Sequence, residues 1–454
     1  MLKTTISCLT ALCFAAVPAA ADSIPSLALS MWARTTIGQV VSSATETGYD
    51  YPFQGEWLAN FEGGLRLSRQ VLPGLEGRLH VGFAANVSTV RQKNFLTAEL
   101  TAKKFTATLL DASMQYLRPG LLAAGDTAQI EFGYFPFKYN PQSTNLGEYM
   151  FRSNCYPAVI MSGFENSIDK PKLGGLHLGY SLKALGLLRQ DLILNSELDM
   201  YPLHDLNLSY IATYMPHPAF TVGAGVQAAR LIVLDRFKTT PALDTNYHPT
   251  LDQWVGYVDP NTGDTTRYTF SGVKLMARAT FDIRALAETF AGKLRLLGAE
   301  DLKLYGEAAV LGVQDYPGWY ANVRQRIPVM GGLNVPTFKL LDVLSVEVEY
   351  FRNPYWNSQE FMWKDGSPVP YTGSSAGLSY ASWNDSMAKT DDDWKWSIYA
   401  SRRLGRFLRI SAAAASDHTP RNWYTPGPPS FVKYTDMVPR SWDWYYMMRV
   451  TMYF

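Results

Sequence analysis

The sequence predicts an all-β chain that folds as a transmembrane antiparallel β-barrel of about sixteen strands, with 14 or 18 strands as the alternatives. Three observations lead to this prediction. Segments in which apolar and polar residues alternate recur along the chain. Beyond the first residues, no apolar run reaches the roughly 18 to 20 residues that a membrane-spanning helix needs. The connections between the alternating segments are short and long in turn, which is typical of such barrels.

The N-terminal segment has the features of a secretory signal peptide. A positively charged start and an apolar run lead to three consecutive alanines at 19–21. Such a segment is removed on export and takes no part in the fold. We therefore expect a signal peptide over 1–21 and a single barrel domain over 22–454. The expected mature chain has one cysteine, Cys155, which excludes an intramolecular disulfide.

Alternation with a period of two residues indicates half-buried strands. In the run LSVEVEY at 344–350, for example, residues of different polarity alternate without interruption. Sixteen segments of this kind are bounded by Gly, Pro, Asn and Asp. They lie at 28–41, 56–69, 77–87, 104–117, 128–137, 172–182, 190–199, 206–214, 219–234, 267–282, 301–313, 327–337, 342–352, 393–403, 406–416 and 441–454.

The connections between these segments alternate in length. Those after even-numbered strands tend to be short, such as VLPGLEG and MPHP, whereas several of those after odd-numbered strands are long: 88–103, 138–171, 235–266 and 353–392. A barrel with both termini in the periplasm has this pattern, with short periplasmic turns and long external loops. The exception is 283–300, a long connection on the short side, in which the run ALAETFAGKLRLLG at 285–298 has the pattern of a short helix between strands.

The last strand, 441–454, is apolar or aromatic at every second position. In a bilayer the outward face of a barrel strand must be apolar, so Arg449 and Thr451 are expected to point into the lumen. The strand resembles the C-terminal signal that the barrel-assembly machinery reads in outer-membrane β-barrels of Gram-negative bacteria. The residues expected to form this signal are Tyr446, Met448, Val450, Met452 and Phe454.

This resemblance covers the architecture of the whole mature chain. It implies export to the outer membrane of a Gram-negative (diderm) bacterium. The partners it implies are outer-membrane lipids, lipopolysaccharide and the barrel-assembly machinery, and assembly as a homotrimer is left open. A formal net charge of +1 excludes nucleic acid as a partner, because binding to phosphates needs a strongly basic face.

A narrower resemblance lies at 131–153, with the sequence EFGYFPFKYNPQSTNLGEYMFRS. It is similar to a segment of phosphate-selective-type porins in which a Gly-x-Phe strand end and a Pro-Phe pair precede a glutamate, a phenylalanine and an Arg or Ser. The matching residues are Gly133, Phe135, Pro136, Phe137, Glu148, Phe151, Arg152 and Ser153. The resemblance implies the porin architecture, whereas the lysine and arginine ladder of the phosphate-selective members is not evident in this sequence.

A barrel of about sixteen strands is wide enough to leave an aqueous channel. Function is then expected in the charges that line the lumen and in whatever narrows it. The expected lumen-facing residues are the basic Arg66, Arg78, Lys274, Arg278, Lys395, Arg409 and Arg449 and the acidic Glu131, Glu307, Glu347 and Glu349. The slight excess of basic residues predicts a weak preference for anions.

The connection 138–171 is the candidate for the pore constriction. It follows the fifth strand, and the third external loop of sixteen-stranded porins, which this chain resembles, folds inward. The connection also contains the run YPAVIMSGF, which a loop exposed to water has little reason to carry. The charged residues expected at the constriction are Lys138, Glu148, Arg152, Glu165, Asp169 and Lys170. Packing of this loop at a subunit interface is the alternative.

These observations predict a porin for the passive diffusion of small hydrophilic solutes. Two alternatives stay open: a substrate-specific channel whose loops bind a solute, and a structural or adhesive barrel plugged by its own loops. Catalysis is not expected, because none of the six histidines lies in a nucleophile motif such as G-x-S-x-G. No cofactor and no metal site are expected. The sequence does not identify the solute.

Overall fold

The structure is a computed structural model. It describes residues 27–43, 46–47, 51–52, 54–55, 57–86, 105–121, 123–152, 171–183, 186–196, 198, 206–232, 254–258, 262, 265–269, 272–313, 322–352, 391–417, 420–424, 432–436 and 438–454. The expected signal peptide, 1–21, lies outside the described residues. So do three residues of the expected constriction, Glu165, Asp169 and Lys170.

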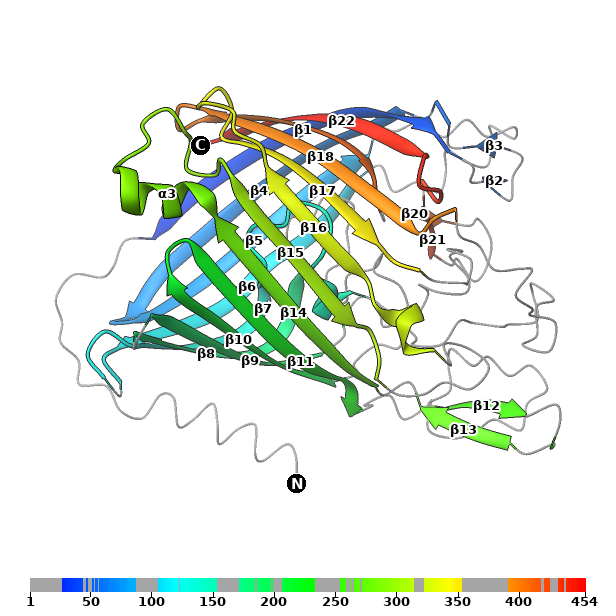
Figure 1. The fold of residues 1–454 in the computed structure, drawn as a ribbon, viewed down its shortest axis with the longest axis horizontal. Coiled ribbons are helices and arrows are strands. Elements are labelled where there is room, and N and C mark those ends of the chain that lie inside the picture. The colour runs from blue at the N-terminus through cyan, green and yellow to red at the C-terminus, as the bar shows by residue number, and fades with distance from the viewer. Residues whose placement is uncertain are drawn as a thin grey trace.

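Sixteen antiparallel strands of the described chain form one closed barrel (Figure 1). In chain order they are β1 (Ala28–Ser42), β4 (Trp57–Leu72), β5 (Leu75–Asn86), β6 (Phe105–Pro119), β7 (Thr127–Pro136), β8 (Lys172–Lys183), β9 (Leu187–Ser196), β10 (Leu206–His217), β11 (Phe220–Ile232), β14 (Gly272–Asp282), β15 (Lys303–Val310), β16 (Val329–Asn334), β17 (Val343–Tyr350), β18 (Trp394–Leu404), β19 (Leu408–Ser416) and β22 (Trp444–Tyr453). Each overlaps one of the sixteen predicted segments, in the same order. The predicted fold class and strand number are therefore confirmed, and this architecture is that of porins.

The barrel closes between its first and last strands. β22 pairs with β1 from Trp32 opposite Tyr453 to Ser42 opposite Trp444. Beyond this ladder, the main chains of Met31 and Phe454 exchange two hydrogen bonds of 3.1 and 2.8 Å. Closure pairs the edges of the described strands. A β-structure in a membrane needs this, because lipid offers no partner to a free backbone N–H or C=O group.

Side chains alternate between an apolar outer face and a polar inner face, as the pleat of a strand requires. On β17, Val348 is 40% exposed, whereas its neighbours Glu347 and Glu349 are buried. On β22, Met448 is 55% exposed and Tyr445 is buried. The exposed face suits a lipid environment, and the polar face surrounds the lumen.

The connections at the two ends of the barrel differ in length. At the end that holds Phe454 they are short, as between β4 and β5 or between β18 and β19. The long connections at the other end contain three two-stranded sheets. These are β2 (Glu46–Thr47) with β3 (Tyr51–Pro52), β12 (Trp254–Val258) with β13 (Thr265–Thr269), and β20 (Pro420–Tyr424) with β21 (Val432–Asp436).

The predicted short helix between two strands is confirmed as α3 (Ile283–Ala291), at the short-turn end of the barrel (Figure 1). Asp282 caps it, because its side chain accepts a hydrogen bond of 2.7 Å from the Ala285 N–H. The helix ends at Gly292, whose positive φ of 76° suits glycine. A 3₁₀ turn, η3 (Val323–Arg326), precedes β16. Among the described residues, no helix has the length and apolar character needed to cross a membrane.

The largest difference between a predicted and an observed strand boundary is at β14. The segment expected as one strand over 267–282 divides, because 265–269 pairs with β12 as β13 and only Gly272–Asp282 joins the barrel. The physical reason lies in the partner strand. The pairing of β11 with β14 ends at Ala229, which lies opposite Gly272. The next residue of β11, Arg230, has a positive φ of 54°, which interrupts the extended chain.

Candidate functional site

The connection that follows β7 enters the barrel and crosses it. Its described part, residues 138–152, is called the crossing segment below. It hydrogen bonds to polar residues on the inner faces of β15 and β17. In the closed barrel β7 and β17 are eight strands apart in either direction, so they belong to opposite walls. A segment that leaves β7 and binds β17 therefore spans the lumen.

Glu307 on β15 is the first anchor of the crossing segment. Its carboxylate accepts hydrogen bonds from the Tyr139 hydroxyl at 2.6 Å and from Asn140 Nδ2 at 2.8 Å. It also accepts from the backbone N–H groups of Glu148 at 3.1 Å and Tyr149 at 2.9 Å. Glu307 is only 3% exposed. A buried carboxylate is costly unless it is fully hydrogen bonded, and these four donors meet that need.

Glu347 on β17 is the second anchor. Its carboxylate accepts from three consecutive backbone N–H groups, those of Thr144 at 2.6 Å, Asn145 at 3.0 Å and Leu146 at 2.9 Å. The Tyr305 hydroxyl donates a fourth hydrogen bond at 2.9 Å. Consecutive N–H groups that converge on one anion form a backbone nest. The tip of the segment is thus fixed to the wall by its own main chain.

Basic side chains hold the carbonyl groups of the same segment. Lys274 on β14 is buried, and its Nζ contacts the carbonyl oxygens of Tyr149 at 3.4 Å, Met150 at 3.3 Å and Arg152. These residues include the single 3₁₀ turn η1 (Tyr149–Phe151). Arg152 in turn donates from Nε to the Gly147 carbonyl at 2.5 Å. The backbone of the segment is therefore bonded on both its donor and its acceptor side.

Glu148 lies in the crossing segment beside Glu307. One of its carboxylate oxygens accepts from the Asn140 N–H at 2.6 Å. The other is buried and has no hydrogen-bond partner among the described residues. Burial, followed by the nearby Glu307 carboxylate, raises the pKa of the Glu148 carboxyl group to about 8, although Lys138 and Arg152 oppose the shift. Glu148 therefore binds a proton more readily than a carboxyl group exposed to water.

The tip of the crossing segment reaches two further strands. The Asn145 side-chain amide donates to Ser397 on β18 at 3.1 Å and to Asp417, which follows β19. Asp417 also accepts from the Tyr445 hydroxyl on β22 at 2.7 Å. The segment is thus linked to a wall of adjacent strands, from β14 to β22.

The start of the crossing segment rests on a polar network of the opposite wall. His177 lies between two carboxylates, with Nδ1 3.4 Å from Glu131 and Nε2 2.8 Å from Asp191. The Phe137 ring packs edge-on against His177, with ring centroids 5.1 Å apart, and against Phe151 at 5.8 Å. This packing fixes the direction in which the chain leaves β7.

All eleven residues expected to face the lumen occupy strand positions that alternate with outward residues. Their roles differ. Lys274 and Lys395 are 1% exposed and bind main-chain carbonyls, and Arg78 pairs with Glu131 at 2.5 Å. The acids Glu307 and Glu347 hold the crossing segment, and Glu349 accepts from the Tyr149 hydroxyl at 2.7 Å. The remaining four are Arg66, Arg278, Arg409 and Arg449, of which Arg278 donates to the Thr213 hydroxyl at 2.9 Å.

The three described residues of the expected constriction, Lys138, Glu148 and Arg152, all lie in the crossing segment. Each is engaged within it: Lys138, for example, donates to the Ser143 carbonyl at 2.5 Å. Sequence reasoning missed the residues that dock the segment, namely Tyr139, Asn140, Thr144, Asn145, Tyr305 and Asp417. The run KYNPQSTN at 138–145 was the available signal, because short polar side chains there can reach a polar wall.

No known protein family and no curated protein sequence matches this chain. Among solved structures, the chain is similar to Salmonella typhi OmpF in complex with daunomycin, at 10% identity and a TM-score of 0.45, over 95% of this chain and 98% of that one. It is also similar to a mutant of Rh. blastica porin, at 7% identity and a TM-score of 0.42, over 94% of this chain and 100% of that one. The fold itself follows from the strand pairing of this chain.

Proposed function

We propose that this chain forms a water-filled channel for the passive diffusion of small hydrophilic solutes. The observation that carries the proposal is the crossing segment, which spans the lumen and is bonded to the wall through Glu307 and Glu347. Its backbone donors are largely used by these contacts. The segment therefore narrows the lumen as a fixed barrier rather than offering its polar groups to one particular solute.

The proposed location is the outer membrane of a Gram-negative bacterium, reached through the signal peptide expected at 1–21. The apolar outer face, with residues such as Leu192 and Leu275 exposed, supports contact with lipid. Lipopolysaccharide, outer-membrane lipids and the barrel-assembly machinery are the proposed partners. Recognition by that machinery would use the outward residues of β22, of which Met448, Val450 and Met452 are exposed.

Conductance across a planar bilayer tests the proposal. The refolded full-length chain is added to a lipid bilayer and single-channel currents are recorded in KCl. We expect current steps of constant size and a linear current–voltage relation. The reason is that the crossing segment is fixed to the wall and does not move when the voltage changes. Absence of conductance from protein whose β-structure is intact would contradict the channel. Saturable blockade by one added solute would instead indicate the substrate-specific alternative.

A further inference from the structure

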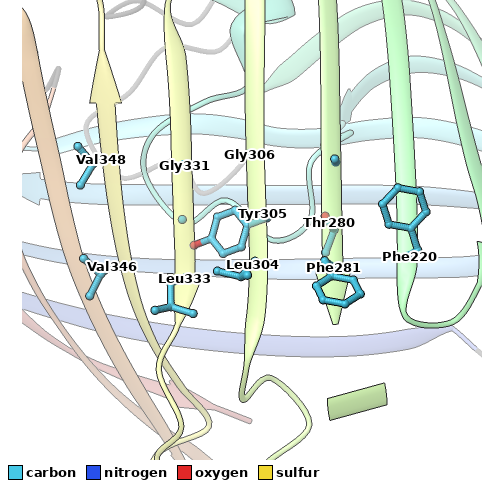
Figure 2. A pocket seen from close by; sticks show the side chains of 12 residues that line it. Phe220, Thr280, Phe281, Leu304, Tyr305, Gly306, Gly331, Leu333, Val346 and Val348 are labelled. Carbon is cyan, nitrogen blue, oxygen red and sulfur yellow. The ribbon is translucent and has the colours of Figure 1, made fainter. Parts of the chain in front are cut away.

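The outer face of the barrel carries an apolar groove. It has a volume of about 640 Å³ and lies over β14 to β17 (Figure 2). Its walls and floor include Phe281, Leu304, Leu333, Val346, Gly306 and Gly331. Leu304 and Leu333 are 42% and 37% exposed. The groove thus belongs to the apolar face and not to the lumen.

Glycine creates the depth of this groove. A Cβ atom added to Gly331 would meet nothing within 4 Å, so the space above this residue is open. On the inner side, the Tyr305 ring lies against Gly332, where an added Cβ would come within 2.3 Å of the ring. Tyr305 therefore closes the groove from the lumen side. The result is a slot lined by apolar side chains, which fits an extended hydrocarbon chain.

The connections at the short-turn end of the same strands expose apolar residues. Phe290 is 84% exposed, and Leu296 and Leu340 are each 77% exposed, more than any other large apolar side chain in the described part of the protein. Phe290 belongs to α3, Leu296 follows it, and Leu340 lies in the turn between β16 and β17. These connections directly follow strands that line the groove. Apolar residues on an amphipathic helix at such a position are typical of a membrane interface.

The same connections carry three exposed basic residues. Lys293, Arg295 and Lys339 are exposed and form no ion pair with the described residues. The nearby acids have partners of their own: Glu288 pairs with Arg284 at 2.9 Å, and Glu300 pairs with Lys303 at 2.8 Å. The two connections thus present three exposed cations, none in an ion pair with a described residue, to an anionic group at this rim.

We propose that the groove and its basic rim bind an anionic phospholipid of the leaflet at the short-turn end. Its phosphate lies at Lys293, Arg295 and Lys339, and one acyl chain occupies the groove above Gly331. The inference rests on the membrane-spanning part of the proposed function and does not require the barrel to conduct. A second copy of this chain fits the surface less well, because a symmetric contact through this face would bring the same cations together.

Native mass spectrometry of the refolded full-length chain in detergent tests this proposal, with phosphatidylglycerol and phosphatidylcholine as the two probes. We expect saturable retention of phosphatidylglycerol and weaker retention of phosphatidylcholine. Replacing Lys293, Arg295 and Lys339 by Gln should weaken phosphatidylglycerol retention about fivefold for each charge removed. Gly331→Leu fills the groove and should remove one bound lipid per barrel. Ala412→Leu, which also places a leucine at an outward position, but on β19, is the control.

Each outcome decides the proposal. If Gly331→Leu and Ala412→Leu retained the same amount of lipid, the groove would not be the binding site of the acyl chain. If phosphatidylglycerol and phosphatidylcholine were retained equally, the basic rim would not bind the headgroup. A change of oligomer mass in Gly331→Leu with unchanged lipid retention would assign the groove to a second copy of the chain. Conductance is recorded from the same preparations. Lipid retention without conductance would contradict the channel function alone.

Discussion

Two buried carboxylates, Glu307 and Glu347, determine where the chain crosses the lumen. Each accepts four hydrogen bonds, and most of these come from residues of the crossing segment. Removing such a carboxylate leaves several buried N–H groups without a partner, which costs more than the net value of one hydrogen bond. The position of the constriction therefore depends on single residues of the wall.

Glu347→Gln tests this dependence. The glutamine amide has one acceptor oxygen where the carboxylate has two, and its N–H₂ group would face the N–H groups of Thr144 to Leu146. The hydrogen bonds to the replaced oxygen would therefore be lost. We expect the stability to fall by about 3 kcal/mol, since hydrogen bonds to a charged group contribute about 1.5–3 kcal/mol. The unit conductance should rise, because the tip is released. Glu62→Gln is the control: it removes the same charge from a wall residue that pairs with Arg34. Equal effects of both changes would contradict the anchoring role.

Glu148 makes the stability depend on pH. The pKa of its carboxyl group is raised from 4.5 to about 8 in the folded chain, so between these values the folded state binds more protons than the unfolded state. Stability from this group is complete below about pH 4.5 and is lost as the pH rises through about 8. Wild type should lose thermal stability in detergent between pH 5 and pH 9, and Glu148→Gln should show a smaller loss. An identical pH dependence in both proteins would mean that Glu148 is ionised throughout.

At the scale of elements, local patterns predicted the strands but not the contacts of the crossing segment. The alternation of polar and apolar residues can be recognised within a single strand, as in β17. It also predicted which residues of the strand face inward. The contact between Thr144 and Glu347 joins residues 203 positions apart. No local pattern encodes such a pair. The sequence predicted from an apolar run that this connection turns inward. In the structure, the described part of the connection is held in the lumen by hydrogen bonds between polar groups.

The division of strand faces gives a prediction for β5. Val81 is outward and 40% exposed, so Val81→Arg should destabilise the barrel in a bilayer by about 2–4 kcal/mol if it lies near the midplane. Gln115→Arg on β6 is the matched change on the inner face, opposite Glu131, and should be close to neutral. Urea unfolding in lipid vesicles measures both. A neutral Val81→Arg would place this part of the outer face away from lipid.

At the scale of the whole molecule, three arginines of the lumen wall stand out because they form no ion pair with the described residues. Wall acids such as Glu307 and Glu347 are surrounded by donors of the crossing segment, and Glu62 pairs with Arg34. By contrast, Arg66, Arg409 and Arg449 make no ion pair with any described residue. They lie on the inner faces of β4, β19 and β22, which are close neighbours around the closure of the barrel. These three arginines therefore add positive charge that no ion pair with a described residue offsets.

These three arginines predict a preference for anions, which a reversal potential can measure. A bilayer that contains the channel is placed between two KCl concentrations, and the zero-current voltage reports the ratio of chloride to potassium permeability. We expect chloride to be favoured, and more strongly at low salt, because screening shortens the reach of the arginines from about 30 Å at 0.01 M to about 3 Å at 1 M. Replacing Arg66, Arg409 and Arg449 together by Gln should move the reversal potential towards zero. Arg69→Gln, at an outward position of β4, is the control and should leave it unchanged. If the triple replacement kept the wild-type reversal potential, the selectivity would have to arise elsewhere than on this wall.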